Sequence, residues 1–125
     1  MIKRIINIAN YWEVIVYYNI DYNFFDYIAK DLKSYSTPVE NIRRIYHNMR
    51  TTAKAFTCSN SYYRISIVGF NIHSDKYDYI NSIIHEAEHI KQAILKYYNI
   101  KDEGENAAYT IAYIATKMLQ IKMMK

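Results

Sequence analysis

The stretch that decides the fold is residues 75–97, which read DKYDYINSIIHEAEHIKQAILKY. Its apolar residues recur at intervals of three and four, the spacing of one side of an amphipathic helix. They are Tyr79, Ile80, Ile83, Ile84, Ala87, Ile90 and Ile94. Ser74 or Asp75 can cap the start of this helix. The sequence therefore predicts a long helix that begins near residue 75 and ends near Tyr97.

Two histidines of this helix, His85 and His89, are four residues apart. They project from the same face, one turn apart, so both imidazoles can reach one metal ion. Glu86 is placed to take a proton from a water molecule that the metal activates, and to pass it to a leaving amine. The H-E-x-x-H pattern predicts a Zn²⁺ site that hydrolyses peptide bonds, with Glu86 as general base.

A catalytic zinc ion needs a third protein ligand. No histidine follows His89, so the downstream candidates are Asp102, Glu103 and Glu105. Glu105 is favoured because it falls in the first turn of the predicted last helix, and Glu103 is the alternative. Since the motif helix extends about 12 Å beyond His89, the loop 98–103 must fold back alongside it.

Four further residues are candidates for supporting roles. His73 ends the preceding strand and can approach the site to stabilise an oxyanion, although an ordinary surface histidine is the commoner case. Asn81 and Ser82, one turn before His85, can orient its ring from behind. Tyr109 can do the same or donate to a reacting carbonyl, but in a chain with 15 tyrosines a core role is expected more often.

Two charged residues depart from the usual form of the motif, which has uncharged residues between the histidines and an apolar residue two positions after the second. They are Glu88 and Lys91. At a spacing of three residues they can pair with each other. They weaken the case for peptidase activity more than the case for metal binding.

The remaining elements are predicted outward from the motif helix. A strand is expected at Trp12–Ile20 and a helix at about 24–33. Thr37-Pro38-Val39-Glu40 has the form of a capping box that starts a helix with a buried stripe reaching Phe56. Residues 57–63 are turn-like, Tyr62–Ile72 forms one strand or two hinged at Gly69, and a last helix covers about 104–123. This order predicts an α+β fold: one domain over residues 1–125, with a small antiparallel sheet packed on helices.

Composition narrows the class of protein. With 125 residues, 51% of them hydrophobic, and a single cysteine, the chain can form a core without a disulfide, which favours a reducing, cytoplasmic setting. No apolar run approaches the roughly 20 residues of a membrane span. Residues 75–105 hold seven acidic and four basic residues, a net charge of −3, whereas the rest of the chain carries +7. An acidic zone with two histidines suits a divalent cation.

The motif and its surroundings resemble the gluzincin branch of metallopeptidases, in which a downstream glutamate completes the pattern. The segment 105–109, ENAAY, looks like the corresponding region of the ImmA/IrrE-type metallopeptidases, which cleave repressor-like proteins. Segments 56–60 and 64–68, together with HEAEH and GENAAY, resemble small zincin-like proteins of phages and mobile elements of gut bacteria. The resemblance spans about residues 56–115. It implies a minimal zincin-like domain in a bacterial host cell or on a virion, with zinc on His85, His89 and Glu105.

The same resemblance implies a protein or peptide substrate, bound as an added strand along Tyr62–Ile72, in a shallow cleft of narrow specificity. A zinc-stabilised interaction module without turnover is the alternative. Nucleic-acid binding is disfavoured, because the one basic stripe lacks interleaved aromatic residues and a known binding motif. That stripe consists of Arg43, His47, Arg50 and Lys54. The sequence leaves the substrate and the oligomeric state open.

Overall fold

The computed structural model describes residues 1–123, with side chains described up to residue 120. Along the chain the elements are β1 (Ile2–Ile8), β2 (Trp12–Tyr18), α1 (Phe25–Ser34), α2 (Val39–Thr51), β3 (Ala55–Asn60), β4 (Ile65–Phe70), α3 (Lys76–Tyr97) and α4 (Gly104–Met123). A single 3₁₀ turn, Tyr22–Phe24, precedes α1. The predicted α+β class is confirmed, as are the positions of α1, α3 and α4.

The four strands form one mixed sheet in the order β1-β2-β4-β3. The outer pairs, β1 with β2 and β3 with β4, are antiparallel, while the central pair, β2 with β4, is parallel. The predicted sheet was wholly antiparallel and lacked β1 and β3. The difference arises because α1, α2 and β3 lie between β2 and β4 in the chain, and this long crossover brings β4 back in the direction of β2.

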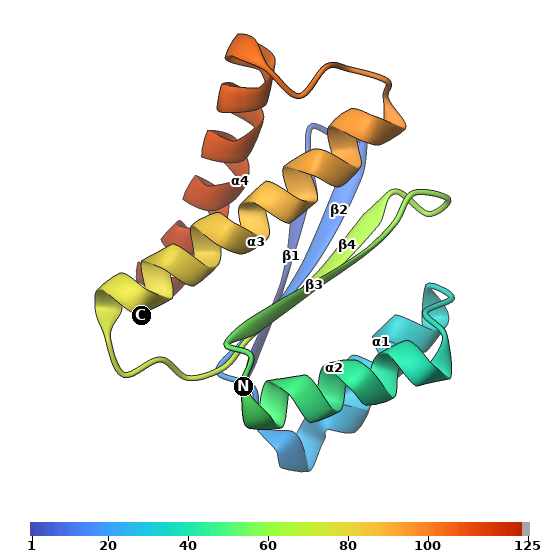
Figure 1. The fold of residues 1–125 in the computed structure, drawn as a ribbon, viewed down its shortest axis with the longest axis vertical. Helices are drawn as coiled ribbons and strands as arrows, with labels where there is room; N and C mark the ends of the chain where they lie inside the picture. The colour runs from blue at the N-terminus through green and yellow to red at the C-terminus, as the bar shows by residue number, and fades with distance from the viewer. Residues whose placement is uncertain (124–125) are drawn as a thin grey trace.

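Helices cover both faces of the sheet (Figure 1). On one face α1 and α2 pack on residues that include Ile15, Tyr17 and Ile67. On the other face α3 and α4 pack on residues that include Val16 and Val68. The sheet is thus the middle of three layers, because alternate side chains of a strand point to opposite faces. The expected helical layer on a single face is replaced by one on each face.

Local chemistry explains most element boundaries. The Asp75 carboxylate accepts hydrogen bonds from the backbone N–H groups of Tyr77 and Asp78 and caps α3 as expected. At α2, in contrast, Pro38 takes the cap position, no side chain caps the helix, and the predicted capping box is absent. Helix α2 also ends at Thr51, earlier than predicted.

Strand β3 occupies part of the segment that was expected to be a turn. Its Phe56 ring lies over Gly69 of β4, where a Cβ atom would come within 2.3 Å of that ring. The Phe56 ring and the Ile20 side chain, whose Cδ1 atom would lie 2.8 Å from that Cβ, therefore favour glycine at residue 69. Within residues 1–123, no helix is both long and apolar enough to cross a membrane.

Candidate metal site and cleft

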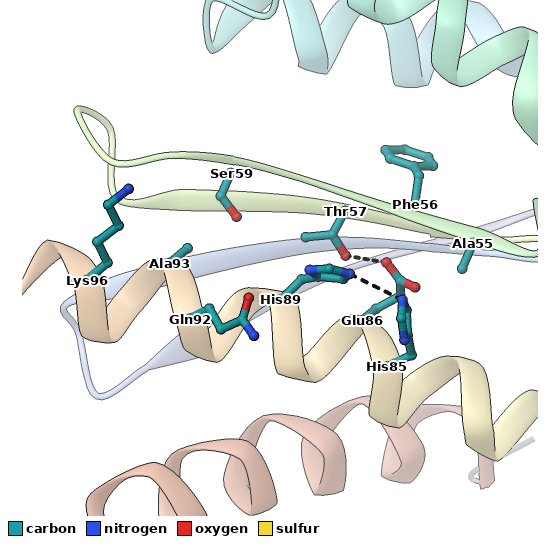
Figure 2. Close-up of a pocket in the computed structure, with 10 residues that line it drawn as sticks. All are labelled: Ala55, Phe56, Thr57, Ser59, His85, Glu86, His89, Gln92, Ala93 and Lys96. Atoms are coloured by element: carbon teal, nitrogen blue, oxygen red, sulfur yellow. Dashed lines mark hydrogen bonds between the residues drawn. The ribbon is translucent and has the colours of Figure 1, made fainter. Parts of the chain in front are cut away.

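Helix α3 lies along the sheet with most of its predicted apolar side buried against β2 and β4, whereas Ile84, which was expected on that side, is 46% exposed. Ile83, Ala87 and Ile90 are fully buried on this side. The neighbouring side of the helix, which carries His85, Glu86 and His89, faces the edge strand β3 (Figure 2). The three motif residues therefore lie between α3 and β3.

The two motif histidines come together as one turn of helix requires. Their Nε2 atoms are 3.2 Å apart and both side chains are exposed. Two nitrogens bound to one tetrahedral zinc ion, each about 2.05 Å from it, are about 3.3 Å apart. The separation of His85 Nε2 and His89 Nε2 therefore fits a shared zinc ion.

Glu86 is buried beside this pair and is held by the edge strand. Only 6% of its surface is exposed, and its Oε1 atom accepts a hydrogen bond of 2.7 Å from the hydroxyl of Thr57. A buried carboxylate without a donor would be costly, so this bond fixes one oxygen of Glu86 and leaves Oε2 for other partners. Thr57 links the motif helix to β3.

The space between α3 and β3 is an open cleft of about 520 Å³. Its lining comes from β3 (Ala55, Phe56, Thr57 and Ser59) and from α3 (His85, Glu86, His89, Gln92, Ala93 and Lys96). Figure 2 shows the motif residues at one end and Lys96 at the other. The cleft thus follows the two elements lengthwise. Thr57, Ser59, Gln92 and Lys96 were not among the residues predicted from the sequence.

The proposed third ligand does not join the two histidines in this structure. Glu105 is exposed in the first turn of α4 and does not line the cleft. Among the described residues no three His, Cys, Asp or Glu side chains form a cluster able to hold a metal ion. Both figures show α4 on the side of α3 away from β3, whereas the histidines face β3. Metal ligation by Glu105, or by Glu103, stays a prediction.

The loop between α3 and α4 folds back as expected, but a different acid contacts α3. The ammonium group of Lys91 lies 2.6 Å from both Glu88 Oε1 and Asp102 Oδ1. Hydrogen bonds to Asp102 and then to Glu88 raise the pKa of Lys91, although its burial opposes them. The predicted ion pair between Glu88 and Lys91 is confirmed. Through its contact with Asp102, Lys91 also holds the loop that follows α3.

Four of the seven acids of the zone 75–105 stabilise α3 or its flanking loops. Asp75 caps α3, Asp78 forms an ion pair with Lys54, and Glu88 and Asp102 share Lys91. Within the described part of the chain, Glu86 is the one acidic residue that lines the cleft. The suitability of the acidic zone for a divalent cation stays a prediction.

The suggested supporting residues lie outside the cleft. His73 is held between the backbone carbonyl of Asn71, at 2.7 Å, and the hydroxyl of Ser82, at 2.9 Å, so Ser82 contacts this histidine and not His85. Asn81 is exposed on α3, and Tyr109 is 70% exposed on α4. None of these residues contributes to the cleft lining.

Two residues of the basic stripe, which runs along α2 and into the loop after it, contact other side chains of the same chain. The guanidinium group of Arg50 lies over the rings of Tyr22 and Tyr46, and Lys54 pairs with Asp78. Arg43 and His47 are exposed. The stripe is therefore not a continuous set of free cations.

No protein-family model, curated protein or solved structure matches this chain. Functional inference therefore rests on the residues of the cleft.

Proposed function

We propose that this protein is a zinc-dependent metallopeptidase that acts in the cleft between α3 and β3. One observation carries the proposal: His85 Nε2 and His89 Nε2 are 3.2 Å apart, and the buried Glu86 lies next to them. This arrangement supplies two nitrogen ligands and a carboxylate for acid–base chemistry on one side of one helix.

A zinc ion, when bound, would polarise the scissile carbonyl and lower the pKa of a water molecule. Glu86 would accept a proton from a water molecule in the cleft and deliver it to the leaving amine nitrogen. Thr57 holds Oε1 of Glu86, so the proton moves on and off Oε2. The exposed side of the cleft leaves room for the substrate.

The substrate in this proposal is an extended peptide that pairs with β3. The expected rim, Tyr62–Ile72, cannot serve, because β4 is an internal strand with β2 and β3 as neighbours. Strand β3 is at the edge, carries no charged residue, and contributes four residues to the cleft lining. The opposite edge, β1, exposes Lys3 and Arg4, which discourage strand pairing. Of the two edge strands, β3 is therefore the better site for a peptide to add as a further strand.

A second candidate is a zinc-binding interaction module that hydrolyses nothing. It is favoured by the lack of a third clustered ligand among residues 1–120. The two candidates share the ligands His85 and His89 and differ in the role of Glu86.

The first experiment is zinc analysis of the purified protein by mass spectrometry. We expect about one zinc ion per chain. His85→Ala or His89→Ala should reduce the affinity for zinc at least tenfold. His47→Ala is the matched control, because His47 is exposed on α2, across the sheet from the cleft. Glu105→Gln tests the third ligand: a similar loss of affinity supports it, and an unchanged affinity excludes it. A wild-type protein that binds no zinc contradicts both candidates.

The second experiment compares wild type with Glu86→Gln on a mixture of unfolded peptides, with cleavage mapped by mass spectrometry. Loss of the base is expected to reduce cleavage by a factor of about 100 or more while zinc stays bound. Zinc binding without cleavage by either protein would identify the interaction module.

A further inference from the structure

Lys96 is the one lysine or arginine that lines the cleft among the described residues, and it lies at the end of the cleft far from the motif. It lies seven residues after His89 on the same side of α3, about 10 Å along the helix axis. Figure 2 shows its side chain extending from α3 toward β3, on the side where His89 and Gln92 lie. Lys96 is exposed and lines the same cleft.

The ammonium group of Lys96 forms no ion pair with any side chain that the structure describes. The other lysine in this part of α3, Lys91, has two carboxylate partners on the opposite side of the helix. Among the residues that the structure describes, the only carboxylate in the cleft lining is Glu86, at the other end. One end of the cleft thus offers a positive charge that no described acid neutralises.

We propose that Lys96 selects substrates with an acidic side chain about three residues from the scissile bond. An extended peptide advances about 3.3 Å per residue, so three residues span the 10 Å between His89 and Lys96. This inference rests on the proposed peptidase function for the position of the scissile bond. Binding of an acidic peptide by Lys96 requires the cleft but does not require peptidase activity.

The direction of the peptide follows from strand pairing. Strand β3 and helix α3 run the same way in both figures, from the motif end of the cleft to the Lys96 end. A peptide added antiparallel to β3, the slightly more stable arrangement, therefore runs from Lys96 toward His85. The acidic residue then lies on the N-terminal side of the scissile bond.

The test uses metal-free Glu86→Gln protein, so that binding is measured without turnover. The probes are fluorescein-labelled eight-residue peptides of Ala, Thr and Val with one Glu at each position in turn, and the same peptides with Gln. We expect the best Glu peptide to bind about two- to fivefold more tightly than its Gln counterpart in 50 mM salt. In 500 mM salt this preference should largely disappear.

Charge reversal identifies the residue. Lys96→Glu is expected to abolish the preference for Glu and to favour peptides with Lys in the same place. Lys33→Glu makes the same change of charge on α1, across the sheet, and should leave the preference unchanged. Equal affinity of Glu and Gln peptides, or a preference that survives Lys96→Glu, overturns the inference.

Cleavage of the same peptides by zinc-loaded wild type separates this inference from the proposed function. A cut about three residues after the Glu supports both. Cleavage that ignores the Glu overturns the role of Lys96 and leaves the peptidase intact. Absence of cleavage, with Lys96-dependent binding of Glu peptides retained, refutes the peptidase and preserves the acidic-peptide site.

Discussion

Glu86 is a buried carboxylate with a single described donor, the hydroxyl of Thr57. Because that donor comes from the edge strand, the orientation of the carboxylate depends on the position of β3 relative to α3. In the proposed peptidase, a carboxylate held in this way is preorganised for proton transfer, and any change of its donor should affect the cleavage rate more than metal binding.

Thr57→Val should therefore lower peptide cleavage by about tenfold or more, because valine has the shape of threonine but cannot donate to Glu86 Oε1. Thr57→Ser retains the hydroxyl and should keep most of the activity. Zinc content should be unchanged in both variants. Cleavage of the peptide mixture and zinc analysis provide the measurements, and full activity of Thr57→Val would refute the positioning role.

The residues of the motif could be predicted because their relation is local. His85, Glu86 and His89 lie within one turn of a helix, and helical spacing alone brings them together. Thr57 and Ser59 could not be predicted, since they reach the cleft only when β3 pairs with β4. Lys96 could not be predicted for a related reason: two turns separate it from His89, and its role depends on the length of the cleft.

At the level of elements, Lys91 holds the loop between α3 and α4 against α3 through Asp102. It lies two residues after His89, about 200° around the helix axis, and so on the opposite side from the cleft. The side chain of Lys91 is 9% exposed, whereas those of Glu88 and Asp102 are 37% and 38% exposed. Solvent therefore screens the two ion pairs in part, and their effect is moderate.

Lys91→Met should lower the free energy of unfolding by about 1–2 kcal/mol at pH 7, because the methionine keeps the apolar stem and loses both carboxylate partners. Lys101→Met is the control, since Lys101 is exposed and its nearest carboxylate, on Glu103, is 4.0 Å away. Urea denaturation followed by Trp12 fluorescence is the measurement. Equal stability of Lys91→Met and wild type would contradict the role of this lysine.

The same ion pairs give a pH dependence with a definite sign. The pKa of Lys91 is raised in the folded protein above its usual value near 10.5. Its stabilising effect is therefore complete below pH 10.5 and is lost as the pH rises through the higher folded-state pKa. The difference in unfolding free energy between wild type and Lys91→Met should stay constant from pH 7 to 10 and shrink above that range.

The helices were more predictable than the strands. The boundaries of α3 and α4 follow from apolar spacing, the Asp75 cap and Gly104, whereas the segment AFTCSN of β3 has small polar residues that are typical of a turn. Its strand conformation depends on pairing with β4, which spacing along the chain does not reveal. The parallel pairing of β2 and β4 was missed for the same reason.

For the whole molecule, the sheet separates two cores, one with α1 and α2 and one with α3 and α4. Ile28 is fully buried in the first core, and Ile83 and Trp12 are buried in the second. Both cores include residues of the central strands β2 and β4, so we expect them to unfold together.

Ile28→Ala and Ile83→Ala should each lower the free energy of unfolding by about 2–5 kcal/mol. Trp12, the single tryptophan, reports only on the second core. If the two cores are cooperative, Ile28→Ala shifts the Trp12 fluorescence transition and the circular dichroism transition equally. A Trp12 transition that stays in place while circular dichroism shifts would show two independent units.

The parallel pairing of β2 with β4 also bears on the order of folding. It joins residues 52 positions apart, such as Glu13 and Ile65, whereas each antiparallel pair closes through a short turn. Closing the longer loop carries the larger entropic cost, so the junction of the two hairpins is expected to be the late step. All residues of the cleft lie between Ala55 and Lys96, on one side of this junction. The cleft is therefore a sequence-local unit whose assembly can begin before the N-terminal hairpin docks.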